Sequence, residues 1–164
     1  MYKTAYKCND EIVCYFDSAG NKYVATGGNL AWRINNPGLV HSHTLFSRRQ
    51  GSIGSFGPYA IFPNAEKGRK ALKAWIYSKK YFNHSLDRLA RHYHPQDSNI
   101  FISQLATLSG LTPNTKIKSL NKQDLDRLLM SIEKLCGYAV MGGHLLDTVA
   151  DWLCVDGANQ RIPF

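Results

Sequence analysis

The chain has 164 residues, of which 44% are apolar and 12% aromatic, and its formal net charge is +8. This length is typical of one domain that buries its own core, and the composition excludes a chain that is disordered throughout. No apolar run approaches the roughly 20 residues that a membrane-spanning helix needs, so we expect no membrane span. The charge favours polyanionic partners, but the Lys and Arg residues are scattered along the chain, and we expect no nucleic-acid partner.

The first predicted element is a β-hairpin within residues 12–26, where two runs of β-forming residues flank a Gly-Asn turn. Residues 32–38 read Trp-Arg-Ile-Asn-Asn-Pro-Gly and predict a specified turn, because Asn tolerates left-handed backbone, Pro fixes φ and Gly frees the next dihedral. The glycine-rich residues 51–62 predict a second, tight hairpin, whose last strand ends at Pro63.

Beyond Pro63 the apolar residues recur with the helical period of 3.6. Asn64, Ser85 and Asn121 are placed to cap helices, and Gly110 and Gly137 are placed to end them. The predicted helices span residues 64–82, 85–94, 98–108, 121–136 and 143–154. We therefore expect a mainly helical α+β fold in a single domain, 1–164, with a β-rich and loop part, 1–63, and a helical part, 64–164.

The four cysteines, Cys8, Cys14, Cys136 and Cys154, lack the CxxC spacing of a structural zinc site. The histidines near positions 41–43 and 92–94 lack the i, i+4 helical spacing with a nearby Glu, so we expect neither a metal nor a cofactor. An even number of cysteines allows disulfides, and the pairs 8–14 and 136–154 are the first to expect. Bridges would suit a periplasmic destination, and four free thiols a cytosolic one.

The first residues, Met-Tyr-Lys-Thr-Ala-Tyr-Lys, contain no apolar segment and no small-residue cleavage site of the kind that defines a Sec signal peptide. We expect the protein to be made in the cytoplasm without such a signal. If it acts outside, phage lysis, a virion or a contractile secretion machine must deliver it.

Several motifs occur in a characteristic order: the turn at 32–38, Gly-Ser-Ile-Gly at 51–54, Tyr-Ala-Ile-Phe-Pro at 59–63, Gly-Arg-Lys-Ala at 68–71, Tyr-His-Pro at 93–95 and Gly-Tyr at 137–138. In this order they resemble a family of short bacterial and phage proteins, known as phage structural or virion-associated proteins. Relatives occur beside secretion-system spikes as cell-wall-degrading effectors. The resemblance covers residues 27–138. It implies action on bacterial peptidoglycan in the periplasm or cell wall of a target bacterium, a lysozyme-like fold, and partners such as a secretion spike, a virion component or an immunity protein.

The end of the helix at 121–136 departs from this family. In the relatives that helix tends to end in Glu-Gly-aromatic, whereas this chain has Cys136, Gly137 and Tyr138. Three interpretations stay open: the Glu of the relatives is not catalytic, its role has passed to Glu133 or Cys136, or this protein works differently.

Cleavage of a glycosidic bond without a metal requires a carboxylic acid that protonates the leaving oxygen. Glu133 falls about 100° from the centre of the apolar stripe of its helix, where partial burial favours a general acid. Pairing with a nearby Lys is the alternative interpretation of Glu133. His94 belongs to the Tyr-His-Pro segment and is expected to line a cleft with Asp97 behind it, so both are further catalytic candidates.

Sugar recognition needs ring faces and polar groups that reach acetamido, lactyl or carboxylate groups. Trp75 and Phe62 are expected in the core instead. The predicted substrate-binding residues are Trp32, Arg33, Asn35, Asn36, His41, Tyr59 and Tyr93.

A rival chemistry is a Cys/His amidase or endopeptidase, in which a thiolate attacks the stem peptide of peptidoglycan. Its alternative nucleophiles are Cys136 and Cys14, with His41, His94 or His144 as the base. Cys136, however, lies about 40° from the centre of the apolar stripe, where a structural cysteine is expected. A third possibility is a non-catalytic protein of the virion or one that binds the cell wall. The sequence thus predicts first a peptidoglycan hydrolase that cleaves the glycan chain by general acid catalysis.

Overall fold

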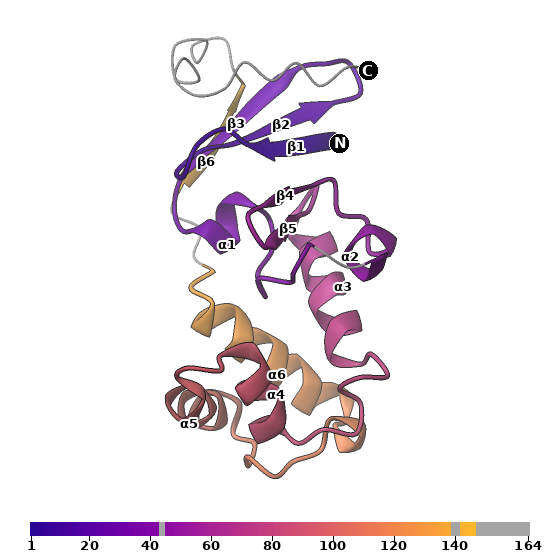
Figure 1. Cartoon of the computed structure of the whole chain (residues 1–164), viewed down its shortest axis with the longest axis vertical. Coiled ribbons are helices and arrows are strands. Elements are labelled where there is room, and N and C mark those ends of the chain that lie inside the picture. Colours follow the sequence, from indigo (N-terminus) through magenta and orange to yellow (C-terminus); the bar gives the residue numbers. More distant parts are fainter. Residues whose placement is uncertain (43–44, 139–141, 147–164) are drawn as a thin grey trace.

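A computed structural model describes residues 1–42, 45–138 and 142–146 of the chain. An antiparallel sheet lies at one end of the molecule and a group of helices at the other (Figure 1). Both helices and strands are present in quantity, and the α+β class predicted from the sequence is confirmed.

The larger sheet has the strand order β1-β2-β3-β6, and its neighbouring strands are antiparallel. The hairpin predicted at 12–26 is confirmed as β2 and β3. Its turn is held by Asp17, whose Oδ1 accepts hydrogen bonds from the backbone N–H of Ala19 at 2.9 Å and of Asn21 at 3.0 Å. The four strands span Tyr2–Lys7, Val13–Asp17, Lys22–Gly27 and Gly142–Leu146.

The fourth strand corrects the sequence prediction. A helix was expected over residues 143–154, but Gly142–Leu146 form β6, in which Leu145 lies opposite Val24 of β3. Glycine is a poor helix former, and β3 offers an edge of unpaired backbone groups that a distant segment can satisfy. The rest of the expected helix, with Cys154, lies outside the described residues.

The second hairpin is confirmed as β4, Gly54–Phe56, and β5, Tyr59–Ile61. It is joined to the larger sheet by a hydrogen bond from the Ala5 N–H to the Ile53 carbonyl at 3.1 Å. The hairpin therefore lies against β1, on the side of the sheet that faces the helices (Figure 1).

The turn at 32–38 follows the short helix α1, Leu30–Arg33. Its left-handed backbone occurs at Asn35, with φ of 53°, and at Leu39, with φ of 47°. Gly38, expected to supply conformational freedom, is needed for close packing instead. A Cβ at this position would lie 2.5 Å from Cδ1 of Leu72 in the following long helix.

That long helix, α3, spans Ala65–Ile76 and begins where predicted, with Asn64 Oδ1 accepting a hydrogen bond from the Lys67 N–H at 2.9 Å. It was expected to run to residue 82, but it ends at 76 and residues 77–84 form turns. These turns bring Tyr81, which is only 3% exposed, back into the core. The helix can lie against the 32–38 turn only because Gly68 has no side chain, since a Cβ there would lie 2.1 Å from the Asn35 carbonyl oxygen.

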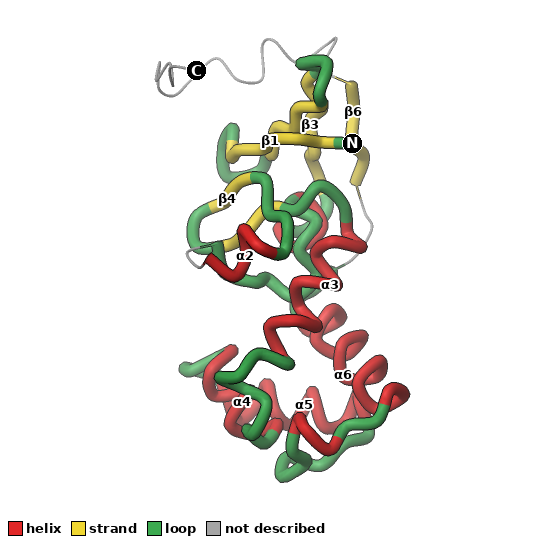
Figure 2. Tube along the Cα trace, turned by 90° about the vertical axis from the view of Figure 1, so that its right-hand side faces the viewer, coloured by secondary structure: helices red, strands yellow, loops and turns green. Residues whose placement is uncertain are grey.

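The other helices confirm the predicted caps. Ser85 caps α4, Asn121 caps α6, and Gly110 ends α5 with φ of 68°. Figure 2 shows α3 passing from the β4–β5 hairpin to the group formed by α4, α5 and α6. The remaining elements are α2, Leu45–Arg49; α4, Leu86–Tyr93; α5, Ser98–Ser109; the 3-10 helix η1, Ile117–Ser119; and α6, Lys122–Leu135.

Two main clusters of buried apolar side chains meet at residues 61 and 62. Ile61 packs in a cluster with Tyr15 and Trp32, under the sheet. Phe62 belongs to the other cluster, which includes Leu72 of α3 and extends through the helices. Because successive side chains of an extended segment point to opposite sides, this short stretch joins the two clusters.

Among residues 1–42, 45–138 and 142–146, no helix combines the length and the apolar character that crossing a lipid bilayer requires.

Candidate functional site

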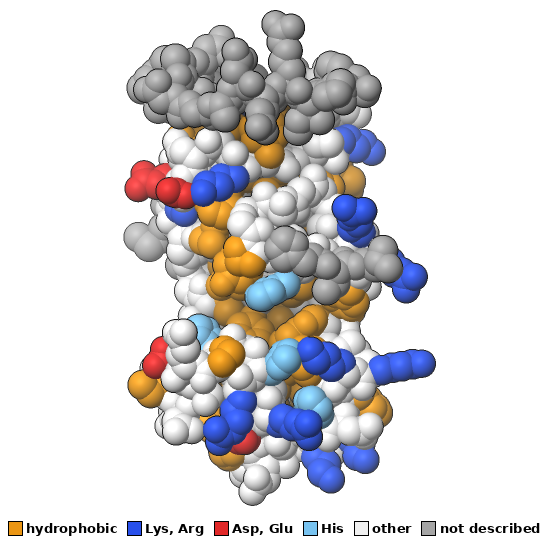
Figure 3. All heavy atoms as spheres, viewed as in Figure 1, with side chains coloured by type: hydrophobic (Ala, Val, Ile, Leu, Met, Phe, Trp, Pro, Cys, Tyr) orange, Lys and Arg blue, Asp and Glu red, His pale blue; other side chains and the backbone are white. Residues whose placement is uncertain are grey.

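A cavity of about 380 Å³ opens where the β4–β5 hairpin, the turn region and the helices meet. We call it the cleft. Figure 3 shows an apolar area at this level of the molecule, bordered by histidine side chains. The lining comes from four parts of the chain: residues 38–41, Tyr59 of β5, Trp75 with the following Lys80 and Tyr81, and residues 92–94 at the end of α4.

One wall of the cleft is a set of packed aromatic rings. Trp75 lies 4.4 Å from Tyr81 between ring centroids, and 5.4 Å from Tyr93 in an edge-to-face arrangement. Behind them, Tyr93 stacks on Phe101 of α5 at 5.4 Å. Rings held on several sides keep their orientation, so this wall is a preformed surface for a flat or ring-shaped ligand.

Nitrogen-bearing side chains form the rest of the wall. Lys80 Nζ lies 2.8 Å from Nε2 of His92, and the His92 ring lies 5.1 Å from Tyr81. Burial lowers the pKa of His92, and the nearby charges of Lys80, His84 and His41 lower it further. A lysine ammonium is only a donor, so His92 Nε2 accepts from Lys80 and the imidazole is neutral in this arrangement.

Four of the residues predicted to form the site line the cleft: His41, Tyr59, Tyr93 and His94. They come from separate parts of the chain and meet only in the fold. His41 packs its ring edge-to-face with Tyr59 at 5.5 Å, and their backbones form an isolated β-bridge.

The two asparagines of the turn, which were predicted to bind sugar, are buried and bond to other groups of the protein. Asn36 Nδ2 donates to the carbonyls of Val40 and Ala60, both at 2.9 Å, and its Oδ1 accepts from the Val40 N–H at 2.8 Å. Asn35 Nδ2 donates to the Tyr15 hydroxyl and the Phe62 carbonyl, both at 3.2 Å. Because these groups are taken up inside the protein, the asparagines hold the 36–40 segment that forms part of the cleft wall.

Trp32 and Arg33 also lie outside the lining of the cleft. The Trp32 side chain is 6% exposed and packs in the cluster under the sheet. Arg33 Nη1 donates to the Gly28 carbonyl at 2.9 Å and to the Gly27 carbonyl at 3.3 Å. The Trp32 ring therefore joins α1 to the cluster under the sheet, and the Arg33 guanidinium joins it to the end of β3. Neither group lines the cleft.

Glu133, the predicted general acid, lies on α6 with its side chain 15% exposed. Both its carboxylate oxygens accept hydrogen bonds from Arg69 Nε, at 3.0 and 3.1 Å. This contact raises the pKa of Arg69, whose guanidinium also lies over the Tyr138 ring at 5.4 Å. Glu133 does not line the cleft, and its partner is an arginine of α3 instead of the lysine considered from the sequence.

Asp97, the other carboxylate candidate, also lies outside the cleft lining. It is exposed and stands at the N-cap position of α5, where its side chain makes no capping hydrogen bond. Its neighbour His94 stacks on Phe101 at 4.8 Å and contributes to the cleft.

Neither of the two predicted nucleophiles, Cys14 and Cys136, is an activated thiol. Cys14 is bonded to Cys8, so the 8–14 pairing is confirmed and Cys14 is not the free thiol that the amidase alternative requires. Cys136 is a free thiol, but burial, with Glu133 acting in the same direction, raises its pKa to about 11. A reactive cysteine needs the opposite shift. The 136–154 pairing involves Cys154, which lies outside the described residues, and the side chain of His144 is not described either.

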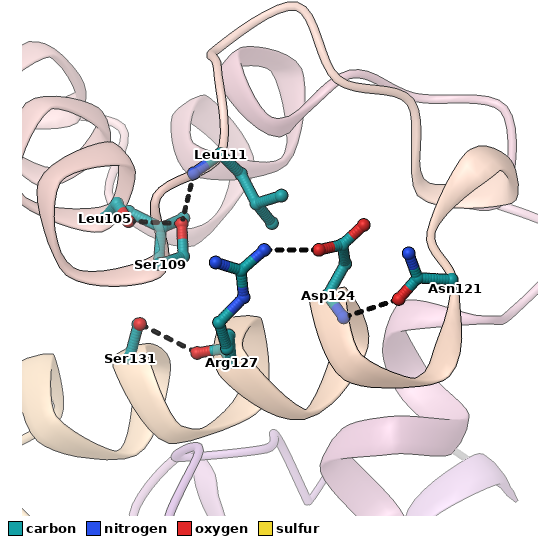
Figure 4. A network of polar contacts seen from close by, with 7 residues as sticks. All are labelled: Leu105, Ser109, Leu111, Asn121, Asp124, Arg127 and Ser131. Carbon is teal, nitrogen blue, oxygen red and sulfur yellow. Dashed lines mark hydrogen bonds and ion pairs between the residues drawn. The ribbon is translucent and has the colours of Figure 1, made fainter.

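Cys136 nevertheless connects α6 to the cleft, since its Sγ lies 3.4 Å from the Tyr93 hydroxyl. A polar network fixes this helix (Figure 4). Asn121 Oδ1 accepts from the Asp124 N–H at 2.8 Å, and Asp124 pairs with Arg127. Ser131 Oγ then donates to the Arg127 carbonyl at 2.7 Å. These bonds lie within α6 itself, and the contact between Cys136 and Tyr93 joins the end of the helix to the aromatic wall.

Sequence reasoning missed Lys80, Tyr81 and His92 as cleft residues and assigned Trp75 to the core alone. Lys80 and Tyr81 were expected inside a helix that in fact ends at residue 76. The signal for His92 was present, because it belongs to the histidine-rich stretch at 92–94. That stretch was considered only as a possible metal ligand set and as the setting of His94.

In the part of the chain that the structure describes, no group of three His, Cys, Asp or Glu side chains could hold a metal ion. The described lining of the cleft also includes no carboxylate. No family model, curated protein or solved structure matches this chain. The function is therefore argued from the cleft and its neighbours.

Proposed function

We propose that this protein binds the glycan chain of bacterial peptidoglycan in the cleft and cleaves it, as an antibacterial effector or a virion-associated lysin. The observation that carries the proposal is the composition of the cleft. The half-buried rings of Tyr59 and Trp75 offer apolar faces, and His41 and His94 add polar nitrogens. Pyranose rings present the complementary pattern of apolar C–H faces and equatorial polar groups.

Glu133 is the proposed general acid, and its position suggests how it would act. Tyr93 lines the cleft and contacts Cys136, which follows Glu133 by one helical turn. Since both oxygens of Glu133 accept hydrogen bonds from Arg69, the ion pair must open before the carboxyl group can carry a proton to a leaving oxygen. We propose that binding of the glycan chain opens it.

A disulfide between Cys8 and Cys14 supports a destination outside the cytoplasm, because such bonds persist in oxidising compartments. We therefore place the action of the protein in the periplasm or cell wall of a target bacterium. An effector of this kind would be carried by a secretion spike or virion component and blocked by an immunity protein that covers the cleft.

A second candidate function is binding to the cell wall without cleavage, as in a structural component of a virion. Two observations favour it: the described cleft lining contains no carboxylate, and Glu133 is held by Arg69. The amidase alternative is less well supported, because the pKa of Cys136 is raised.

One experiment separates these functions. The purified protein is incubated with sacculi, and soluble muropeptides are analysed by mass spectrometry. Glycan cleavage releases saccharide fragments, an amidase releases stem peptides, and a binding protein co-sediments with the sacculi and releases neither.

Two variants then test the acid. Glu133→Gln keeps the size of the side chain and should abolish release with little change in melting temperature. Glu66→Gln is the matched control, because Glu66 is an exposed glutamate that pairs with Lys70 at 2.7 Å outside the cleft. Full activity of Glu133→Gln would exclude Glu133 as the acid, and an inactive Glu66→Gln would mean that general damage explains the loss.

A further inference from the structure

The cleft has an unusual distribution of charge. Some cationic side chains elsewhere in the described chain pair with carboxylates, as Lys70 does with Glu66 and Arg91 with Asp87. Lys80, in contrast, contacts the neutral His92 at 2.8 Å and lies over the Tyr81 ring at 5.1 Å. No Asp or Glu belongs to the described cleft lining around them.

Such a pair suits an anion. A carboxylate placed beside Lys80 Nζ and His92 Nε2 can accept a charge-assisted hydrogen bond from each, once the imidazole takes up a proton. Burial and the charges of Lys80, His84 and His41 lower the pKa of His92, so without an anion the imidazole resists taking up a proton. A bound carboxylate would favour the protonated imidazole and so offset this effect.

The surroundings of the pair add a second requirement. The Tyr81 ring lies beneath both groups, 5.1 Å from the Lys80 Nζ and 5.1 Å from the His92 ring, and Trp75 packs against it at 4.4 Å. The Tyr81 ring is itself only 3% exposed, so the ring face left for a ligand beside the pair is that of the half-buried Trp75. A ligand that fills this corner therefore combines a carboxylate with a ring or apolar face. Neutral sugars supply only the second feature.

We propose that Lys80 and His92 bind the carboxylate of an acidic sugar residue, so that the cleft selects the muramic acid unit of the glycan chain over its neutral N-acetylglucosamine unit. This inference rests on the proposed function and names the sugar that the same cleft recognises. The carboxylate has two sources in peptidoglycan: the lactyl group of a muramic acid without a stem peptide, and the stem peptide attached to that lactyl group.

The test is isothermal titration of the full chain with three soluble probes: chitobiose, which is neutral; the N-acetylglucosamine–N-acetylmuramic acid disaccharide, with a free lactyl carboxylate; and the same disaccharide with its stem peptide. We expect at least one acidic probe to bind about tenfold more tightly than chitobiose, which corresponds to one charge-assisted contact. The acidic probe that binds more tightly identifies the source of the carboxylate.

Variants assign this preference to the two side chains. Lys80→Gln and His92→Gln should each weaken binding of the acidic probe, so that its affinity falls to within about twofold of the affinity of the same variant for chitobiose. Lys79→Gln is the matched control, because Lys79 is the adjacent exposed lysine and does not line the cleft. Circular dichroism checks that each variant is folded.

The failures of the two proposals are distinguishable. Equal binding of all three probes, or a preference that survives both substitutions, overturns the carboxylate site and leaves glycan cleavage intact. A protein that releases saccharides from sacculi but binds none of the probes likewise overturns only this inference. A protein that neither binds the probes nor acts on sacculi overturns both.

Discussion

The turn at 32–38 and the loop at 77–84 differ in how their polar groups are used. The turn has the more distinctive sequence, yet the side chains of its asparagines form hydrogen bonds with other groups inside the protein. The loop looks ordinary in sequence, yet Lys80 and Tyr81 line the cleft. A polar side chain can bind a ligand only when its hydrogen-bonding groups are not already taken up by other groups of the protein. The turn therefore acts as the scaffold, and the loop supplies part of the binding surface.

The largest loss of stability should come from a substitution at the contact between the turn and α3. Gly68→Ala would place a methyl group 2.1 Å from the Asn35 carbonyl oxygen, so helix and turn must separate. We expect a loss of about 3 kcal/mol in the free energy of unfolding, measured by chemical denaturation. Lys67→Ala, at an exposed neighbouring position of the same helix, should change the free energy by less than about 0.5 kcal/mol. Similar stability of both variants would mean that the turn does not need close packing against α3.

A smaller loss of stability is expected from Asn36→Ala, which leaves the buried carbonyls of Val40 and Ala60 without their side-chain donor. The expected cost is about 2 kcal/mol in the free energy of unfolding. Lys80→Gln, in the loop, should leave stability nearly unchanged. If Asn36→Ala were as stable as the parent but failed to bind sacculi, the turn would belong to the binding surface instead of the scaffold, and Asn36 would be a ligand contact.

A clear effect on binding is expected at Tyr59. Its ring is half-buried at the cleft and lies edge-to-face with His41. Tyr59→Ala should weaken co-sedimentation with sacculi by about tenfold, the value of one stacking surface. Tyr6→Ala serves as the control, because Tyr6 is a 50% exposed tyrosine of β1 that does not line the cleft. Equal binding by both variants would show that the sugar does not use this wall.

Local signals in the sequence were sufficient for much of the fold. The caps Asn64, Ser85 and Asn121 each bond to a backbone N–H three residues away, so they could be recognised without knowing the fold. The same holds for the Cys8–Cys14 pair, which closes a short segment. The strand β6 could not be recognised in this way, because its hydrogen bonds go to β3, more than a hundred residues earlier in the chain.

The candidate site was predicted only in part for the same reason. The histidine and aromatic residues at 41, 59, 93 and 94 were identified as chemically suitable, and the fold brings them together. The roles of Trp32, Asn35 and Asn36 could not be judged, because a buried structural asparagine and a ligand-binding asparagine look alike in sequence. Lys80 was missed because the end of α3 depends on the core that Tyr81 enters.

By itself, the sequence determined the α+β class, the two hairpins and the starts of the long helices, since turns, caps and apolar periodicity act over a few residues. Only the tertiary structure decided that β6 completes the sheet, that Glu133 pairs with Arg69, and that aromatic rings, histidines and Lys80 meet in the cleft lining. These features depend on partners that are distant in sequence. Whether a polar group bonds within the protein or remains open to a ligand is set by those partners.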